Sequence, residues 1–461
     1  MMMLSEIAKA LNTQVIGKDV NVLSIGTDSR NIEAGQLFVA LKGDNFDGNT
    51  YAAEAVKLGA AAAVISGADV EVSPAVLVGD TRTALGELAQ YWRQKFSLPV
   101  VAITGSNGKT TVKEMITSIL NAASGEVLAT KGNFNNDVGM PLTLLNMRAE
   151  HEYAVIEMGM NHMGEIRYLT NIAQPQVAVV NNAGTAHIGE LGSREDIAQA
   201  KGEIFEGLSD SGIAVINADD DFGPYWQSLN VERKVITFGL DVTGFSAAAD
   251  VSATYETQAT HMQVKLKTPS GMVAFNLNVL GKHNVSNALA ASAVAVALGI
   301  NNEVIAAGLT QFNGVQGRLQ QYVGYQGAVV IDDTYNANPD SMKAAVDVLT
   351  NQLGSDESYA IFVMGDMGEL GDNSGAMHAA IGQYAGQQGV SKLFSFGKLS
   401  RLASDALGEN GQHFETIEAL VEAVKREMHV GMCVLVKGSR SMKMERVVKA
   451  IIKDEKLGSA H

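Results

Sequence analysis

Thr104-Gly105-Ser106-Asn107-Gly108-Lys109-Thr110-Thr111 is the stretch that decides the fold of this chain. It follows the apolar run 100–104 and precedes residues 110–120, for which we expect a helix. A glycine-rich turn between a buried strand and a helix is typical of a phosphate-binding loop, because its backbone N–H groups can approach phosphate oxygens. The common pattern G-x-x-x-x-G-K-[ST] would place glycine where this chain has Ile103, so the loop is a shortened variant. A chance glycine turn is the alternative, and the strand-to-helix context argues against it.

The loop supplies candidate residues for binding a nucleotide and its metal ion. Lys109 can reach the β- and γ-phosphates, and the Thr110 hydroxyl can hold magnesium. The candidate ATP-binding residues of the loop are Gly105, Ser106, Asn107, Gly108, Lys109, Thr110 and Thr111.

Alternating strands and helices extend outward from this loop and predict an α/β fold. With domains of roughly 100–200 residues, a chain of 461 residues is expected to form three. We expect a small N-terminal α/β domain over 1–82 and a central domain over 83–316, with a doubly wound parallel sheet around the phosphate loop. Within it, residues 250–280 alternate apolar and polar and predict antiparallel strands. Strand–helix alternation returns in a third domain over 317–461, which contains no G-x-G-x-x-G, so a dinucleotide fingerprint is not supported.

Composition excludes several classes of protein. The formal net charge of -16 argues against a nucleic-acid partner, because duplex binding needs a basic field. The single cysteine, Cys433, lies in an apolar run and is expected to be a buried strand thiol. We see no signal peptide and no apolar run of about 18 residues, so we expect a cytoplasmic protein without membrane insertion. The sequence carries little information on oligomeric state, and a monomer is the default expectation.

Polar residues follow several of the expected central strands. Glu157 ends the expected strand 153–157 and is a candidate magnesium ligand, with a solvated strand-end glutamate as the alternative. His187 follows the expected strand 177–180, and Lys201 lies on a helix for which Ser193 is the expected N-cap. A histidine and a lysine become partners only around a negative group. A satisfied loop histidine and an exposed helix lysine are the alternatives.

Further polar clusters occur later in the chain. Asn287 lies in the first turns of an expected alanine-rich helix and could bind a base, whereas simple N-capping would explain Asn284. Residues 332–341, 365–371 and 437–440 each follow an expected strand of the third domain. Strand ends that carry similar polar residues predict one crevice along one edge of the sheet.

Taken together, these motifs resemble those of the muramyl-peptide ligases, in matching order over nearly the whole chain. The resemblance implies a domain for a UDP-sugar, a central P-loop ATPase domain, and a Rossmann-like third domain for the incoming amino acid or dipeptide. It implies ATP and Mg²⁺ as cofactors. It also implies an acyl-phosphate reaction, in which the substrate carboxylate attacks the γ-phosphate and an amine then displaces phosphate.

The resemblance assigns roles by position. The implied catalytic residues are Lys109, His187 and Lys201. The implied magnesium ligands are Thr110, Glu157, His187 and Lys201, the last as a carbamate. The implied further nucleotide contacts are Asn287, which contacts adenine, and Arg318 and Asp333, which are reached when the third domain closes. The implied UDP-sugar-peptide contacts are Ser29, Arg30, Phe46, Asn135 and Asn136. The implied dipeptide contacts are Tyr335, Asn336 and Asn338.

Within the family, the stretch Asp333-Thr334-Tyr335-Asn336-Ala337-Asn338-Pro339 is similar to that of members that add D-alanyl-D-alanine to UDP-N-acetylmuramoyl-tripeptide. The stretches 133–139, 365–371, 27–30 and 43–48 agree with this interpretation. A sister ligase that adds another residue, or a folylpolyglutamate synthase, is the alternative within the same chemistry. A P-loop kinase or ATPase without amide formation, and a nucleotide-binding scaffold without catalysis, are alternatives from other classes.

Overall fold

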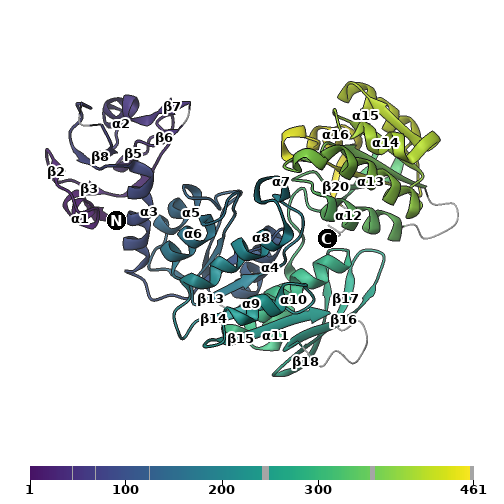
Figure 1. Cartoon of the computed structure of the whole chain (residues 1–461), viewed down its shortest axis with the longest axis horizontal. Helices are drawn as coiled ribbons and strands as arrows, with labels where there is room; N and C mark the ends of the chain where they lie inside the picture. Colours follow the sequence, from purple (N-terminus) through teal and green to yellow (C-terminus); the bar gives the residue numbers. More distant parts are fainter. Residues whose placement is uncertain (44, 68, 124, 241–248, 353–358, 457–461) are drawn as a thin grey trace.

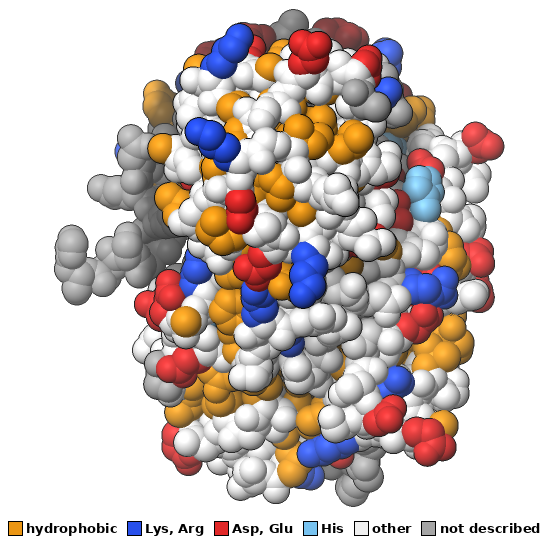
Figure 2. Space-filling view, turned by 90° about the vertical axis from the view of Figure 1, so that its left-hand side faces the viewer, with side chains coloured by type: hydrophobic (Ala, Val, Ile, Leu, Met, Phe, Trp, Pro, Cys, Tyr) orange, Lys and Arg blue, Asp and Glu red, His pale blue; other side chains and the backbone are white. Residues whose placement is uncertain are grey.

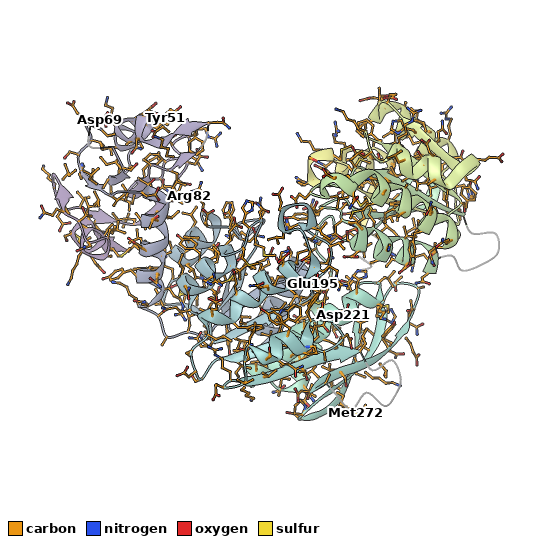
Figure 3. All side chains as sticks on the ribbon, in the orientation of Figure 1. Tyr51, Asp69, Arg82, Glu195, Asp221 and Met272 are labelled. Atoms are coloured by element: carbon orange, nitrogen blue, oxygen red, sulfur yellow. The ribbon has the colours of Figure 1, made fainter. Side chains whose placement is uncertain are left out.

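The computed structural model describes residues 1–43, 45–67, 69–123, 125–240, 249–352 and 359–456. Three sheets follow one another along the chain, and the N-terminal and C-terminal parts stand on either side of a central part (Figure 1). Among the described residues, side chains of the two outer parts do not meet, and Tyr51 and Asp69 lie at the far end of the N-terminal part (Figure 3). Asp44, within the stretch 43–48, lies outside the described residues.

The central part is built on a nine-stranded sheet. Its strands are, in spatial order, β11 (Glu126–Ala129), β12 (His151–Glu157), β10 (Val100–Thr104), β13 (Val177–Val180), β14 (Ile213–Asn217), β15 (Lys234–Leu240), β16 (Val251–Thr257), β17 (Met262–Thr268) and β18 (Gly271–Leu277). The strands from β11 to β16 are parallel, and β16, β17 and β18 are antiparallel. The expected parallel sheet and its antiparallel segment are therefore confirmed as one continuous sheet.

Helices cover both faces of this sheet. One face packs against α4 (Lys109–Ala123), α10 (Lys282–Ala297) and α11 (Asn302–Gln311). The other packs against α3 (Thr81–Arg93), α5 (Gly139–Leu145), α6 (Glu165–Ala173) and α8 (Arg194–Gly202). The shorter helices are α7 (Ile188–Leu191), η2 (Glu203–Gly207) and α9 (Gly223–Ser228). Ser193 caps α8 as expected, because its side chain accepts from the Asp196 N–H group.

The C-terminal part contains a seven-stranded sheet. Its strands are, in spatial order, β23 (Gly411–Phe414), β22 (Lys392–Phe396), β21 (Tyr359–Gly365), β24 (Met432–Lys437), β20 (Val329–Asp333), β19 (Gln320–Gly324) and β25 (Ile452–Lys456). The first five are parallel, and β19 and β25 extend the edge in antiparallel pairs. Its helices are α12 (Pro339–Asn351), α13 (Ser374–Gln387), α14 (Arg401–Leu407), α15 (Ile417–Glu427) and α16 (Glu445–Ile451), with 3-10 turns η3 (Tyr325–Gly327), η4 (Gly371–Asn373), η5 (Gly408–Asn410) and η6 (Arg440–Met442).

The N-terminal part is smaller and has its own sheet. Its five strands are, in spatial order, β2 (Val15–Ile16), β9 (Ala75–Leu77), β8 (Ala62–Ile65), β5 (Gln36–Val39) and β4 (Ser24–Gly26). Two short pairs accompany it: β1 (Met2–Met3) with β3 (Asn21–Val22), and β6 (Lys42–Gly43) with β7 (Phe46–Asp47). Its helices are α1 (Leu4–Ala10), η1 (Gly48–Tyr51) and α2 (Ala52–Lys57).

Apolar packing joins neighbouring parts. One buried cluster extends from α4 and α10 of the central part to α12 and α13 of the C-terminal part. A second extends from the N-terminal sheet across α3 to the other face of the central sheet. On the face shown in Figure 2, hydrophobic side chains and charges of both signs are intermingled. Among the described helices, none is both long and apolar enough to cross a membrane.

Candidate nucleotide and metal site

The phosphate loop connects β10 to α4, so it lies at the carboxyl edge of the central sheet. A neighbouring loop supports it: Ser106 N donates to Asn182 O at 3.0 Å, and Asn107 N donates to Asn182 Oδ1 at 2.8 Å. The first N–H groups of α4 have no partner within the helix. They are therefore available to an anion bound in front of the loop.

Gly108 is required at its position for two reasons. Its φ of +80° lies in the left-handed region that side chains disfavour. A Cβ atom there would lie 2.3 Å from Asn287 Oδ1 and 2.6 Å from Asn181 Nδ2. Asn287 therefore lies directly against the loop, where its Oδ1 accepts from Asn181 Nδ2 at 3.0 Å. The N-cap of α10 is Gly281, so the capping explanation for Asn284 is wrong; Asn284 Nδ2 instead donates to Leu280 O.

Lys109 begins α4, and its Nζ atom donates to Gly105 O at 2.6 Å. Burial lowers the pKa of Lys109, and the negative charge of Glu157 opposes that shift. The Lys109 amine therefore lies against the loop. The oxygens of a bound phosphate would compete with Gly105 O for its hydrogen bonds.

Glu157 is the last residue of β12, beside β10 in the parallel register. It is 2% exposed, so the alternative of a solvated strand-end glutamate is wrong. Its Oε1 atom accepts from Asn135 Nδ2 at 2.8 Å, whereas Oε2 is buried without a hydrogen-bond partner. A buried carboxylate oxygen that lacks a partner is costly, and a bound cation would satisfy it.

Lys201 lies near the end of α8 and is 1% exposed, so the alternative of an exposed helix lysine is wrong. Among the described residues, it takes part in no salt bridge. Burial lowers the pKa of Lys201 well below its usual range, and the charge of Lys109 lowers it further. Lys201 is therefore near the phosphate loop, under conditions that favour a neutral amine.

His187 follows β13 and is the N-cap of α7. Its side chain is partly buried, and its Nδ1 atom lies 2.9 Å from Glu369 Oε2 of the C-terminal part. The close contact with the His187 ring lowers the pKa of Glu369, against the effect of burial. This carboxylate is the negative group beside His187 in the described structure.

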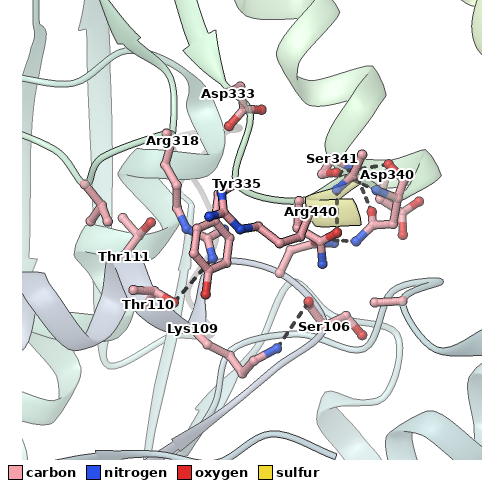
Figure 4. A pocket seen from close by; sticks show the side chains of 18 of the residues that line it. Ser106, Lys109, Thr110, Thr111, Arg318, Asp333, Tyr335, Asp340, Ser341 and Arg440 are labelled. Atoms are coloured by element: carbon pink, nitrogen blue, oxygen red, sulfur yellow. Dashed lines mark hydrogen bonds between the residues drawn. The ribbon is translucent and has the colours of Figure 1, made fainter. Parts of the chain in front are cut away.

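Arg318 reaches the phosphate loop from the start of the C-terminal part. Its Nη2 atom donates to Thr110 Oγ1 at 3.3 Å, and its guanidinium carbon lies 4.3 Å from the centre of the Tyr335 ring (Figure 4). Arg318 Nε is buried without a hydrogen-bond partner. A fixed guanidinium with an unused donor at this place is suited to an anionic ligand.

Asp333 ends β20 next to Lys437, which ends β24, in the parallel register. Lys437 Nζ donates to Asp333 Oδ2 at 2.6 Å and to Asn336 O at 2.9 Å. Burial lowers the pKa of Lys437, and the adjacent Asp333 carboxylate opposes that shift. This ion pair fixes the backbone that leads from Asp333 to Asn338.

Asn338 carries out two functions at once. It is the N-cap of α12 in a capping box with Ser341. Its Nδ2 atom also donates to Asn107 Oδ1 of the phosphate loop at 2.8 Å. The candidate dipeptide segment is therefore in direct contact with the candidate nucleotide site.

A cavity of about 1880 Å³ joins these features. The predicted site residues that line it are Ser106, Asn107, Gly108, Lys109, Thr110, Thr111, Asn135, Asn136, Glu157, His187, Asn287, Arg318, Asp333, Tyr335, Asn336 and Asn338. Gly105 and Lys201 lie outside its lining. Among the described residues, those that line it all lie between Ser106 and Ile452. The candidates of the N-terminal part are therefore not brought to the cavity in this arrangement.

Ser29, Arg30 and Phe46 lie on the N-terminal part. Arg30 forms an exposed ion pair with Asp28 at 2.8 Å, and Phe46 is 56% exposed. Asn135 and Asn136, predicted for the same ligand, line the cavity from the central part. The two groups could contact one ligand only if that ligand extended across the space between the parts.

The residues suit a hard cation. Among the described residues, no cluster of three or more His, Cys, Asp or Glu side chains forms a metal site. The candidate ligands Thr110, Glu157, His187 and Lys201 are of a different kind, because two of them are a hydroxyl and an amine and only two are a Glu and a His. Mg²⁺ prefers oxygen ligands and is usually held by few protein groups together with phosphates. The partnerless Glu157 Oε2 and the Thr110 hydroxyl, which line the same cavity, fit that chemistry.

Three family models match the chain: the Mur ligase family catalytic domain over residues 21–93, the Mur ligase middle domain over 103–295, and the Mur ligase glutamate ligase domain over 317–440. The UDP-N-acetylmuramoyl-tripeptide--D-alanyl-D-alanine ligase of Escherichia coli K12 is 43% identical to it. That similarity covers 97% of this chain and 98% of the relative. The chain belongs to the Mur ligase family.

Solved Mur ligase structures have the same architecture. A crystal structure of MurF from Acinetobacter baumannii is 38% identical, with a TM-score of 0.88 and coverage of 96% of this chain and 97% of that one. MurF from Thermotoga maritima in complex with ADP is 27% identical, with a TM-score of 0.81 and coverage of 93% and 96%. The Mur ligase fold expected from the motifs is therefore confirmed.

Two groups of this Mur ligase site were not predicted as site residues. Lys437 was noted only as part of a polar strand end, and its pairing with Asp333 bridges 104 positions of sequence. Asp220 accepts from Ala183 N at 2.9 Å, and burial raises its pKa. Asp220 lies in the run Asp219-Asp220-Asp221, which gives no local sign that one of the three is partly buried and lines the cavity.

Proposed function

We propose that this Mur ligase uses ATP to join D-alanyl-D-alanine to UDP-N-acetylmuramoyl-tripeptide. The observation that carries the proposal is the shared cavity, in which the phosphate loop faces the segment 333–341. ATP and an incoming dipeptide could lie side by side there. The identity of 43% to a ligase of that name, over nearly the full length, supports the same substrates.

We assign the three parts of the chain to three ligands. The proposed boundaries are 1–82 for the UDP-sugar, 83–316 for ATP and 317–461 for the dipeptide. The separate sheets support this division, although α3 crosses the first boundary because it begins at Thr81. The proposed UDP-sugar-peptide contacts are Ser29, Arg30, Phe46, Asn135 and Asn136. The proposed dipeptide contacts are Tyr335, Asn336 and Asn338.

The phosphate loop would hold the nucleotide. Lys109 would leave Gly105 O for the β- and γ-phosphates, and the N–H groups of the first turn of α4 would complete the cradle. Asn287 would contact adenine, and Arg318 and Asp333 would contact the nucleotide from the C-terminal part. The contact between Arg318 and Thr110 supports this assignment, because it already brings that guanidinium to the loop.

Thr110, Glu157, His187 and a carbamylated Lys201 would hold magnesium. Bound magnesium would screen the approach of one anion to another. The substrate carboxylate would attack the γ-phosphorus of ATP and release ADP. The neutral dipeptide amine would then attack the acyl carbon, lose a proton and release inorganic phosphate. Docking of the C-terminal part would protect the acyl phosphate by excluding water.

Phosphate release tests the function. We expect release from ATP and Mg²⁺ only when UDP-N-acetylmuramoyl-tripeptide and D-alanyl-D-alanine are both present, with a product heavier by the dipeptide less one water. Tripeptides ending in diaminopimelate and in lysine should be compared. Release without the dipeptide would indicate a plain ATPase, and release with a different amine would indicate a sister ligase.

Two variants separate catalysis from nucleotide binding alone. Lys109→Ala should lower phosphate release by roughly 100-fold or more, because it removes a charge directed at the transferred phosphate. Lys282→Ala removes an exposed lysine from the start of α10 and should leave release unchanged. A scaffold without catalysis would show no difference between them. We also propose that the protein is a monomer that acts in the cytoplasm and has no nucleic-acid partner. Light scattering of the same preparation, which gives the molar mass, tests whether it is a monomer.

A further inference from the structure

The loop over residues 183–189, here called the histidine loop, belongs to the central part but is held by the C-terminal part. It follows β13, carries His187 and continues into α7, which reaches toward the C-terminal part in Figure 1. Two carboxylates of the C-terminal part contact it, Asp340 from α12 and Glu369 from the loop after β21.

Asp340 holds the first half of the histidine loop. Its Oδ2 atom accepts from both Thr185 N, at 2.8 Å, and Thr185 Oγ1, at 2.9 Å. The fit is close, because a Cβ atom on Gly184 would lie 2.5 Å from the same oxygen. A carboxylate that accepts two hydrogen bonds from one residue fixes both its backbone and its side chain.

Glu369 holds the second half. Its Oε2 atom lies 2.9 Å from His187 Nδ1, and its backbone oxygen accepts from Gly189 N at 3.2 Å. His187 and Glu369 have φ values of +65° and +62°, so both residues adopt the left-handed conformation. That conformation is disfavoured for a residue other than glycine, so surrounding contacts must maintain it.

Both carboxylates are themselves rigidly placed. Asp340 lies in the first turn of α12, two residues after the Asn338 cap that also contacts Asn107. The loop of Glu369 is fixed by His378, whose Nε2 atom accepts from Met367 N at 2.9 Å. It is also fixed by Asp366, whose carboxylate accepts from the N–H groups of residues 398–400.

We infer that Asp340 and Glu369 are positioning residues that set the histidine loop, and with it His187, only when the C-terminal part is docked. The inference rests on the proposed function, in which His187 is a magnesium ligand. The position of His187 then depends on docking of the C-terminal part, which carries the proposed dipeptide contacts. By linkage, magnesium and docking of the C-terminal part favour each other.

Hydrogen exchange measures the positioning directly and needs no substrate. The Thr185 amide donates to the Asp340 carboxylate, and the Glu369 carboxylate contacts His187, whereas Gly189 N donates to the backbone oxygen of Glu369, which a substitution retains. Asp340→Asn and Glu369→Gln weaken the two side-chain contacts that hold the histidine loop, so each should speed exchange in residues 183–189 by at least about fivefold. Exchange in β13 and α12 should stay unchanged. Asp372→Asn, which alters an exposed carboxylate next to the Glu369 loop, is the matched control and should behave as the unaltered protein.

The second arm measures phosphate release as a function of Mg²⁺ concentration. Partners that orient a metal ligand typically change metal affinity by about 10–100-fold, so the half-maximal Mg²⁺ concentration should rise by that factor in both variants. The KM for ATP at saturating Mg²⁺ should change little. Thr185→Val removes the hydroxyl donor from the histidine loop itself and should give a smaller shift in the same direction.

The outcomes separate the inference from the proposed function. Unchanged exchange in residues 183–189 would overturn the positioning role. Faster exchange with an unchanged Mg²⁺ dependence would overturn the link to His187. If the unaltered protein released no phosphate with the dipeptide, the proposed function would fail, while the exchange arm would still report on the histidine loop. If Asp340→Asn failed to fold, Thr185→Val would carry both measurements.

Discussion

The Nζ atom of Lys437 donates to Oδ2 of Asp333 at 2.6 Å, and both side chains are largely buried where β24 and β20 end. Lys437→Met would leave the Asp333 carboxylate buried without its partner. We expect the free energy of unfolding to fall by about 3–5 kcal/mol in urea titrations, because an uncompensated buried charge is costly. Arg401→Met is the control, since it breaks an exposed pair with Asp405 and should change stability by less than about 0.5 kcal/mol. Equal effects of the two variants would contradict the prediction.

Gly108→Ala should damage the phosphate loop through contact as well as strain. Its Cβ atom would meet Asn287 Oδ1 at 2.3 Å, in addition to the left-handed φ of +80°. We expect ADP binding, measured by calorimetry, to weaken by at least about tenfold. Gly299→Ala is the matched control, because its φ is +77° and a Cβ atom there would meet nothing within 4 Å. Gly299→Ala should cost roughly 1–2 kcal/mol of stability and leave ADP binding unchanged.

Lys201→Ala should lower phosphate release by roughly 100-fold or more, because it removes a proposed magnesium ligand and with it the stabilisation of charge that the ion would supply. Carbamate formation requires a neutral amine and CO₂, and the lowered pKa of this buried lysine favours that form. High bicarbonate should not rescue the variant, whereas a short-chain carboxylic acid should restore part of the activity. In the unaltered protein, ¹³C-bicarbonate should give a carbamate signal by nuclear magnetic resonance. Full activity of the variant would reject the role.

Cys433 should react with thiol reagents only after unfolding. It is the single cysteine, it is buried in β24, and burial raises its pKa to about 12. At pH 8 the thiolate fraction is then about 10⁻⁴, and the reagent has no direct access. Labelling should be slow in the native protein and fast in urea. Adding ATP to the native protein should slow labelling further, because a ligand that binds the native state opposes unfolding. Fast native labelling without ATP would contradict this burial.

The sequence predicted the elements that depend on local pattern. The strand 100–104, the turn at Gly105–Gly108 and the following helix are confirmed because each is specified within a few residues. The antiparallel segment over 250–280 is confirmed for the same reason, since alternation with period two is a local property of a half-buried strand. The family assignment also came from short motifs and their order.

The environment of the candidate residues depended on the tertiary structure. From their local sequence alone, Glu157 and Lys201 were more typical of solvent-exposed residues than of a site, and only the packing of β12 and α8 buries them. Arg318 meets Thr110 across 208 positions, and Asn338 meets Asn107 across 231. Such contacts depend on how separate sheets dock, which no local pattern encodes.

The sequence by itself therefore determined the secondary structure around the phosphate loop, the α/β class and the family. The tertiary structure alone decided which polar side chains share one cavity, and that Asp340 and Glu369 hold the histidine loop from another part of the chain. The physical reason is the range of the interactions. Backbone conformation and strand burial follow from neighbouring residues, whereas desolvation and ion pairing depend on groups brought together only by the complete fold.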